Sequence, residues 1–145
     1  MATRSTVTIR VNAGLTIHLY RHHDGGPWGT GSDLTRRLRA WARTPTSRGE
    51  VIDSVTDMVT RMIRSGDYRL TDDACCHGDA EWHYDVEVLA VADAMTVTIR
   101  TRCPYENVWR TVSAGSVATV RAWMAVWMRD TVLTAIRRRR RAVKA

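Results

Sequence analysis

The chain has 145 residues, 44% of them hydrophobic and 26% charged, which is typical of one globular domain. The formal net charge is +7, but Arg137–Arg141 and Lys144 supply six of the 22 basic side chains, so residues 1–136 hold 16 basic against 15 acidic residues. We therefore expect a nearly neutral domain over residues 1–136 and a basic C-terminal tail over residues 137–145.

Apolar runs and cysteines indicate the compartment. No apolar run approaches the length that crosses a bilayer, and the first residues have no signal-peptide core. The three cysteines are odd in number and two are adjacent, Cys75 and Cys76, which excludes a disulfide framework. We expect a cytoplasmic protein with no membrane association.

The chain opens with two alternating segments. Val7, Ile9 and Val11 alternate with polar residues, and residues 15–20 alternate again after a turn signal at residues 12–14. This pattern predicts an N-terminal β-hairpin.

Two helices are expected next. Ser32 or Asp33 is a possible N-cap for the first, which ends before Pro45 because a residue that precedes proline avoids helical geometry. The second runs from about residue 48 to 65, with Gly66 as its C-terminal cap. Both have one apolar stripe, formed by Leu34, Leu38 and Trp41 in the first and by Val51, Ile52, Val55, Met58, Val59, Met62 and Ile63 in the second.

Residues 68–70 are a possible short strand, and residues 81–88 and 95–101 form a second hairpin that turns near residues 91–93. Its exposed faces carry opposite charges, Glu81, Asp85 and Glu87 against Arg100 and Arg102. Residues 107–112 are a possible edge strand. A helix follows over residues 117–136, and its apolar residues cover more than one stripe, which indicates deep burial or a second subunit.

Together these elements predict an α+β fold. It has an antiparallel sheet of two β-hairpins, a central αα unit, and a long C-terminal helix packed on the sheet or in a dimer.

The five histidines fall in two windows, residues 16–27 and 74–85, which are also rich in Asp, Gly and aromatic residues. Glycines let a backbone or ligand approach, and titratable groups at strand ends are typical of binding sites. Each window also has a purely structural interpretation, as a turn-rich loop in the first and as a solvated strand face in the second. The candidate ligand-binding residues are Tyr20, Arg21, His22, His23, Asp24, Gly25, Trp28, His77, Asp79 and Glu81.

In the functional interpretation of the first window, His22, His23 and Asp24 gather with the glycine N–H groups around an anionic or polar ligand, and Trp28 offers a flat surface. In the second window, a His77–Asp79 pair either orients an imidazole or ties down a loop.

Enzyme signatures are weak. Cys75-Cys76-His77 lacks the spacing of a zinc site, and a catalytic metal would require the two windows to converge. No nucleophile elbow, phosphate loop or dinucleotide fingerprint is present, so we expect no cofactor and favour binding over catalysis. The run Arg137, Arg138, Arg139, Arg140 and Arg141 suits either phosphate backbones or a solvated helix end.

The two windows resemble paired signatures of a family of small proteins from bacteriophages and prophages. The first signature, Tyr-Arg-His-x-Asp-Gly-aromatic-Pro-x-Gly, is matched at Tyr20, Arg21, His22, Asp24, Gly25, Pro27 and Gly29. The second, His-Gly-Asp-x-Glu-aromatic-x-Tyr, is matched at His77, Gly78, Asp79, Glu81, Trp82 and Tyr84. The likeness covers about the first two-thirds of the chain and departs at Gly26, where the pattern has an aromatic residue and where Trp28 is a possible substitute.

This resemblance implies a phage-type accessory protein rather than a particular reaction. We expect it to counteract a host or bacterial defence component, by binding a nucleotide-like ligand or a protein partner. The alternatives are a metal-dependent hydrolase or nuclease that uses the His and Asp windows, and a nucleic-acid-binding protein that uses the arginine tail. The apolar C-terminal helix suggests a homodimer in each case.

Overall fold

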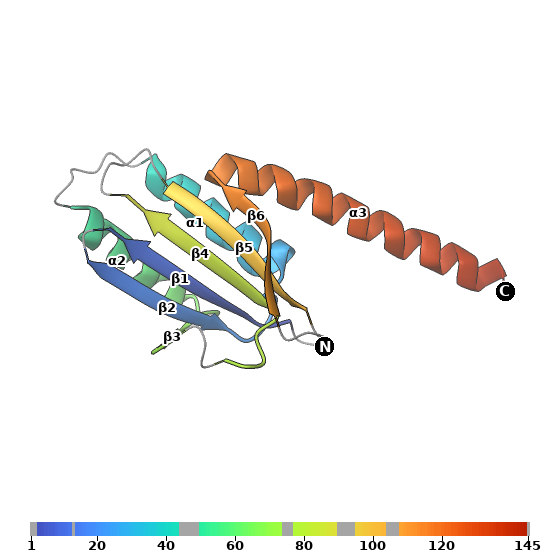
Figure 1. Ribbon diagram of the computed structural model, residues 1–145, viewed down its shortest axis with the longest axis horizontal. Coiled ribbons are helices and arrows are strands. Elements are labelled where there is room, and N and C mark those ends of the chain that lie inside the picture. The colour runs from blue at the N-terminus through green and yellow to red at the C-terminus, as the bar shows by residue number, and fades with distance from the viewer. Residues whose placement is uncertain are drawn as a thin grey trace.

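A six-stranded sheet with the order β3-β2-β1-β4-β5-β6 forms the centre of the protein (Figure 1). The structure is a computed structural model, and it describes residues 3–12, 14–43, 50–73, 77–89, 95–103 and 108–144. The strands are β1 (Ser5–Val11), β2 (Leu15–Arg21), β3 (Arg69–Thr71), β4 (Trp82–Val88), β5 (Met95–Cys103) and β6 (Val108–Gly115).

The strand pairing confirms a mixed α and β fold with a mostly antiparallel sheet, but a sheet of two hairpins is too simple a description. β1 pairs antiparallel with β2 on one side and parallel with β4 on the other, and β3 and β6 extend the sheet at its edges. β1 is therefore a central strand. Its polar side chains Thr6 and Thr8 are as fully buried as Val7 and Ile9, although alternation alone predicts a half-buried strand.

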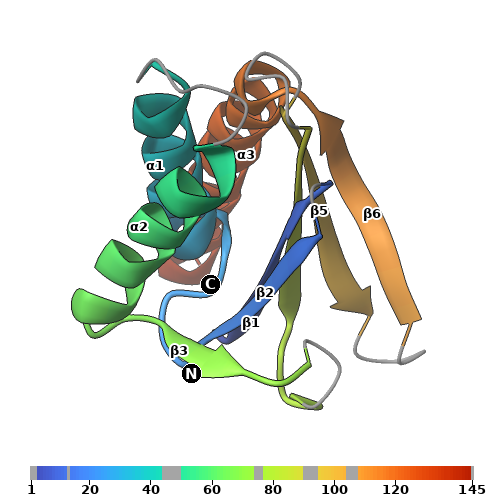
Figure 2. The same ribbon diagram turned by 90° about the vertical axis from the view of Figure 1, so that its left-hand side faces the viewer.

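Helices α1 (Ser32–Ala42) and α2 (Val51–Arg64) cover one face of the sheet, and no helix of the described chain lies over the central strands on the other face (Figure 2). The core lies between these layers. It contains Val7, Ile9, Val11, Leu19, Leu34, Leu38, Val51, Val55, Met62, Tyr84, Val86, Val88, Val97 and Ile99.

The helix ends differ in part from expectation. Gly66 has φ +83° and donates its N–H to the Ile63 carbonyl (3.0 Å), so it caps α2 as predicted. The predicted Ser32 or Asp33 cap of α1 is wrong, because a π-helical turn, η1 (Pro27–Gly31), runs directly into α1 and no side chain caps it. The predicted helix stop at residues 44–47, the turn at residues 91–93, and Cys75 and Cys76 lie outside the described residues.

Helix α3 (Val117–Lys144) packs on the body through its first turns and then projects beyond the sheet (Figure 1). Val120 and Met124 are buried, whereas residues 132–139 are all exposed. The helix continues to Lys144, eight residues beyond its expected end, so the arginine run begins within a helix. Within the described ranges, no helix combines the length and apolar character that crossing a bilayer requires.

Candidate functional site

The two histidine windows meet at one end of the sheet. Tyr20 of the first window stacks on His77 of the second, with ring centroids 3.9 Å apart and an interplanar angle of 16°. Strand pairing causes this meeting, because Ser5 of β1 lies opposite Arg21 of β2 on one side and opposite Trp82 of β4 on the other. The end of β2 and the segment before β4 are thus brought to the same edge of the sheet.

Hydrogen bonds and one ion pair join side chains of both windows. The Tyr20 hydroxyl donates to Asp79 Oδ2 (3.2 Å) and lies 3.3 Å from His22 Nδ1. Arg4, which the sequence did not single out, has its Nε 3.2 Å from Asp79 Oδ2 and 3.4 Å from His22 Nδ1. Burial, followed by the charge of Asp79, raises the pKa of Tyr20, so the hydroxyl stays protonated and acts as a donor.

His22 and His23 are exposed beside this cluster, with their rings edge to face and centroids 4.4 Å apart. His77 and Asp79 do not bond to each other. His77 Nε2 instead lies 2.9 Å from the Thr71 hydroxyl, so this part of the second window ties β3 to the end of the sheet. The exposed Glu81 contributes its backbone N–H, which donates to the Arg4 carbonyl (3.0 Å).

Two of the ten candidate residues point elsewhere. Arg21 donates to the Tyr68 hydroxyl (3.2 Å) and lies 5.1 Å from the centre of its ring. That hydroxyl in turn donates to Asp33 on α1 (3.0 Å), so Arg21 is on the helical side of the sheet. Trp28 is half-exposed, and its ring lies edge to face with that of Trp127 of α3, with the ring centroids 5.7 Å apart.

The glycine-rich loop of the first window is structural. Two of its glycine N–H groups already have partners, since Gly25 donates to the Thr3 carbonyl (2.8 Å) and Gly29 to the Gly26 carbonyl (3.2 Å). The exposed Asp24 has φ +54°, and its carbonyl accepts the N–H of Thr30 at 2.7 Å. The predicted cradle of glycine N–H groups for an anion is therefore wrong at Gly25 and Gly29.

A pocket that the sequence did not reveal lies on the open face of the sheet, next to the cluster of Tyr20, His22, His77 and Asp79, with a volume of about 410 Å³. His77 and Gly78 connect it to the second window. The other side chains come from five strands and the segment after β3, namely Thr6, Thr8, Arg10, His18, Asp73, His83, Arg100, Arg102 and Trp109.

Threonines of β1 hold the two histidines of this pocket that come from strands. The Thr6 hydroxyl lies 2.8 Å from His83 Nδ1, and the Thr8 hydroxyl lies 2.9 Å from His18 Nδ1. Because Nδ1 of each ring is engaged at the floor of the pocket, Nε2 remains as the edge that can bind a ligand.

The pocket is rich in positive charge. Asp85 on the same face pairs with Arg10 and, at 3.6 Å, with Arg100, which confirms the predicted contact of opposite charges between β4 and β5 for Asp85 and Arg100. Arg102 donates to the Gly78 carbonyl. Burial is the main cause that lowers the pKa of His83, with Arg100 and Arg10 adding to it against the opposing effect of Asp85, so the ring is neutral at pH 7.

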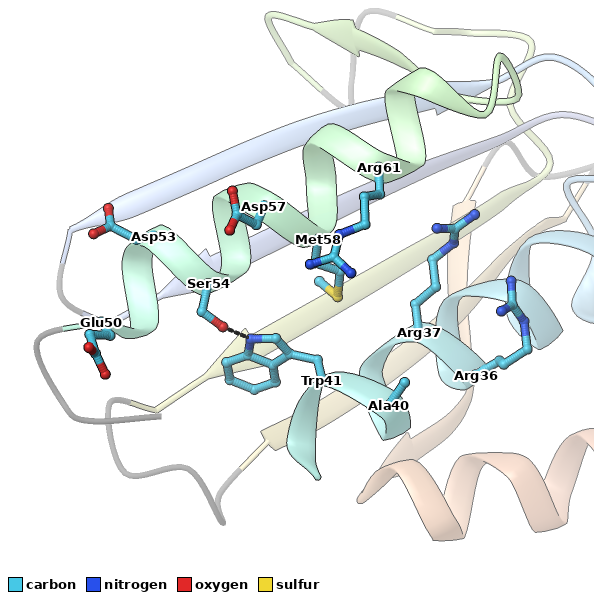
Figure 3. A pocket seen from close by; sticks show the side chains of 10 residues that line it. All are labelled: Arg36, Arg37, Ala40, Trp41, Glu50, Asp53, Ser54, Asp57, Met58 and Arg61. Carbon is cyan, nitrogen blue, oxygen red and sulfur yellow. Dashed lines mark hydrogen bonds between the residues drawn. The ribbon is translucent and has the colours of Figure 1, made fainter. Parts of the chain in front are cut away.

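A larger hollow of about 600 Å³ lies on the other side of the molecule, between α1 and α2 (Figure 3). Trp41 forms its floor and donates to Ser54. Three arginines gather at one end of this hollow and three carboxylates toward the other, so their charges offset each other. None of the candidate residues lines it, and we regard it as a groove left where two amphipathic helices diverge.

Within the described part of the chain, no three His, Cys, Asp or Glu side chains gather closely enough to hold a metal ion. The exposed Arg137, Arg138 and Arg139 lie on the projecting part of α3. Comparison with protein-family models, with curated proteins and with solved structures finds no match to this chain.

Proposed function

We propose that this chain is a binding protein for an anionic, nucleotide-like ligand, which it holds in the pocket on the open face of the sheet. The observation that carries the proposal is the composition of that pocket, in which three histidines and three arginines surround a space beside Trp109. Its volume of about 410 Å³ lies within the range that small-molecule sites occupy.

Each part of a nucleotide has a suitable partner there. Arginine guanidinium groups bind phosphate through two parallel hydrogen bonds, and Arg100 is partly exposed at the pocket. Trp109 is 37% exposed on the edge strand β6 and offers a flat surface on which a base can stack. The Nε2 edges of His18 and His83 supply hydrogen-bonding groups for the sugar or base.

The cluster of Tyr20, His22, His77 and Asp79 forms one end of this site in the proposal. His77 belongs to both, since it lines the pocket and stacks on Tyr20. The exposed His22 and His23 would then contact the part of the ligand that extends out of the pocket. A concave, basic site favours a small molecule over a host protein as the ligand.

The resemblance to phage and prophage proteins suggests a biological setting for this binding. A phage-type accessory protein that takes up a nucleotide-like signal counteracts the host or defence component that depends on that signal. This assignment rests on the paired signatures alone, and the fold adds no argument for it.

A hydrolase or nuclease has less support. That function needs His22 or His77 as a general base with Asp24 or Asp79 as its partner. His77 is bonded to Thr71, and Asp79 is engaged by Tyr20 and Arg4. Turnover of a phosphodiester that His77→Ala abolishes would refute the proposal of binding alone.

Thermal denaturation of the purified chain with ATP, cyclic AMP, cyclic di-GMP, NAD and inorganic phosphate tests the proposal. A ligand at 100 times its Kd adds about 2.7 kcal/mol, which raises Tm by roughly 5–11 °C for a chain of this size. Arg100→Gln and Trp109→Ala should each remove the shift.

Arg36→Gln is the matched control, because Arg36 is an exposed arginine of the helical groove, on the other side of the molecule. It should keep the full shift. No shift with any of the five compounds, or a shift that Arg100→Gln leaves intact, would contradict a ligand site on the sheet face.

A further inference from the structure

Helix α3 has an exposed apolar face that the body of the protein does not cover. Val126 is 48% exposed, and Leu133 and Ile136 are each 43% exposed. With Ala122 and Arg129, which are also exposed, these residues recur at alternating intervals of four and three. This spacing is typical of the residues by which one helix packs along another, and we call these five residues the seam of α3.

The charges of α3 are unevenly placed. Its one acidic residue, Asp130, lies near the middle of the helix beside Arg129, with Arg129 Nε 3.5 Å from Asp130 Oδ1. Arg137–Arg141 occupy the C-terminal turns. Two such helices in parallel would place both arginine runs side by side, which like-charge repulsion opposes. In an antiparallel pair the runs lie at opposite ends.

An antiparallel pair centred near Thr131 is also complementary in detail. Val126 of one copy lies level with Ile136 of the other, and Arg129 lies level with Leu133. The methylene groups of Arg129 can then cover the second copy's Leu133 while its guanidinium reaches that copy's Asp130. Two arginines and two aspartates at the centre sum to zero charge.

We propose that α3 is a dimerisation helix, which pairs antiparallel with α3 of a second copy of this chain. The 28 residues of α3 span about 42 Å, so the two helices overlap along nearly their whole length. The seam residues lie on the exposed side of α3, where a second copy can approach. Each body sits at one end of the helix pair, and the pocket on each sheet face stays open.

Light scattering after size-exclusion chromatography of the nuclease-treated full chain measures the prediction directly. The native chain should have twice its monomer mass of 16.4 kDa at micromolar concentration. Leu133→Asp should halve the measured mass, whereas Thr134→Asp, an exposed neighbour outside the seam, should leave it unchanged.

A charge test probes the register without altering an apolar residue. Arg129→Glu alone and Asp130→Arg alone each place like charges at the centre and should be monomeric. Mixed together they restore both opposite-charge contacts and should form a heterodimer.

Cross-linking tests the orientation, in a chain whose three native cysteines are replaced by serine. Val126→Cys combined with Ile136→Cys should form a covalent dimer, and Val126→Cys alone should not. A native monomer, a dimer that nuclease treatment removes, a dimer that Leu133→Asp leaves intact, a mixture that fails to associate, or cross-linking by Val126→Cys alone would each overturn the proposal.

Discussion

The loop glycines of the first window allow a test that separates a structural role from a ligand-binding one. Gly25 and Gly26 are adjacent, both buried and neither has a positive φ, yet they differ in the space around them. A Cβ on Gly25 would lie 2.4 Å from the carbonyl carbon of Arg4 and 2.6 Å from the backbone nitrogen of Ser5. A Cβ on Gly26 would meet nothing closer than 3.7 Å, the Nε1 atom of Trp82.

Gly25→Ala therefore forces the start of β1 away from the loop by about 1 Å. Overpacking of this kind costs about 1–3 kcal/mol, which lowers Tm by roughly 2–12 °C in a chain of this size. Gly26→Ala keeps ordinary van der Waals contacts at an extended backbone position, and it should be neutral or stabilise by about 0.4–1 kcal/mol through the unfolded state.

Chemical and thermal denaturation of the two variants beside the native chain measure this difference. Ligand-induced shifts should remain in Gly26→Ala, because Gly26 does not line the pocket on the sheet face. The reasoning would be refuted by a Gly25→Ala chain as stable as the native one, or by a Gly26→Ala chain that is the less stable of the two.

Three further predictions concern stability. Burial lowers the pKa of His83 in the folded chain below its ordinary value of 6.5. As pH drops from 7, His83 is therefore protonated in the unfolded chain before it is protonated in the folded chain. Stability should fall from pH 7 through 6.5 until the pH reaches the lower pKa of the folded chain. His83→Asn should remove that part of the pH dependence and Thr98→Val should keep it, whereas an unchanged slope in His83→Asn would contradict the assignment. Tyr68→Phe should cost about 1.5–3 kcal/mol, because it removes a buried hydroxyl that donates to Asp33, and Tyr20→Phe on the exposed side less than about 0.5 kcal/mol. Denaturant titration measures both losses of stability, and equal losses in Tyr68→Phe and Tyr20→Phe would disprove this prediction. Leu38→Ala should cost about 2–5 kcal/mol, since its side chain is fully buried, and a smaller loss would mean that the core collapses around the cavity.

Local patterns predicted most of the elements because their causes are local. The apolar stripes of α1 and α2, the Gly66 cap and the alternation of β4 depend on residues within a few positions of each other. The pairing of β1 with β4 does not, since Thr6 and His83 are 77 positions apart. No local pattern predicts which strand will lie beside β1, and the pocket depends on that pairing.

The candidate site was predicted in part for the same reason. Tyr20 and Arg21 are neighbours in a strand, and neighbours in a strand point to opposite faces, so strand phase alone could have excluded Arg21 from a site that contains Tyr20. The same rule places His18 and Tyr20 on one face, and His83 with Asp85 on another strand. Only the strand order shows that these side chains share a surface.

The parallel contact between β1 and β4 divides the chain into two halves, β1 to β3 with the first helices and β4 to β6 with α3. The boundary between these halves runs through the pocket, with Thr6, Thr8 and His18 on one side and His83, Arg100 and Trp109 on the other. A ligand in the pocket would therefore bridge two segments that the chain joins only once. Amide hydrogen exchange along β1 and β4 should slow when a ligand fills the pocket, so exchange rates at this boundary would measure ligand binding.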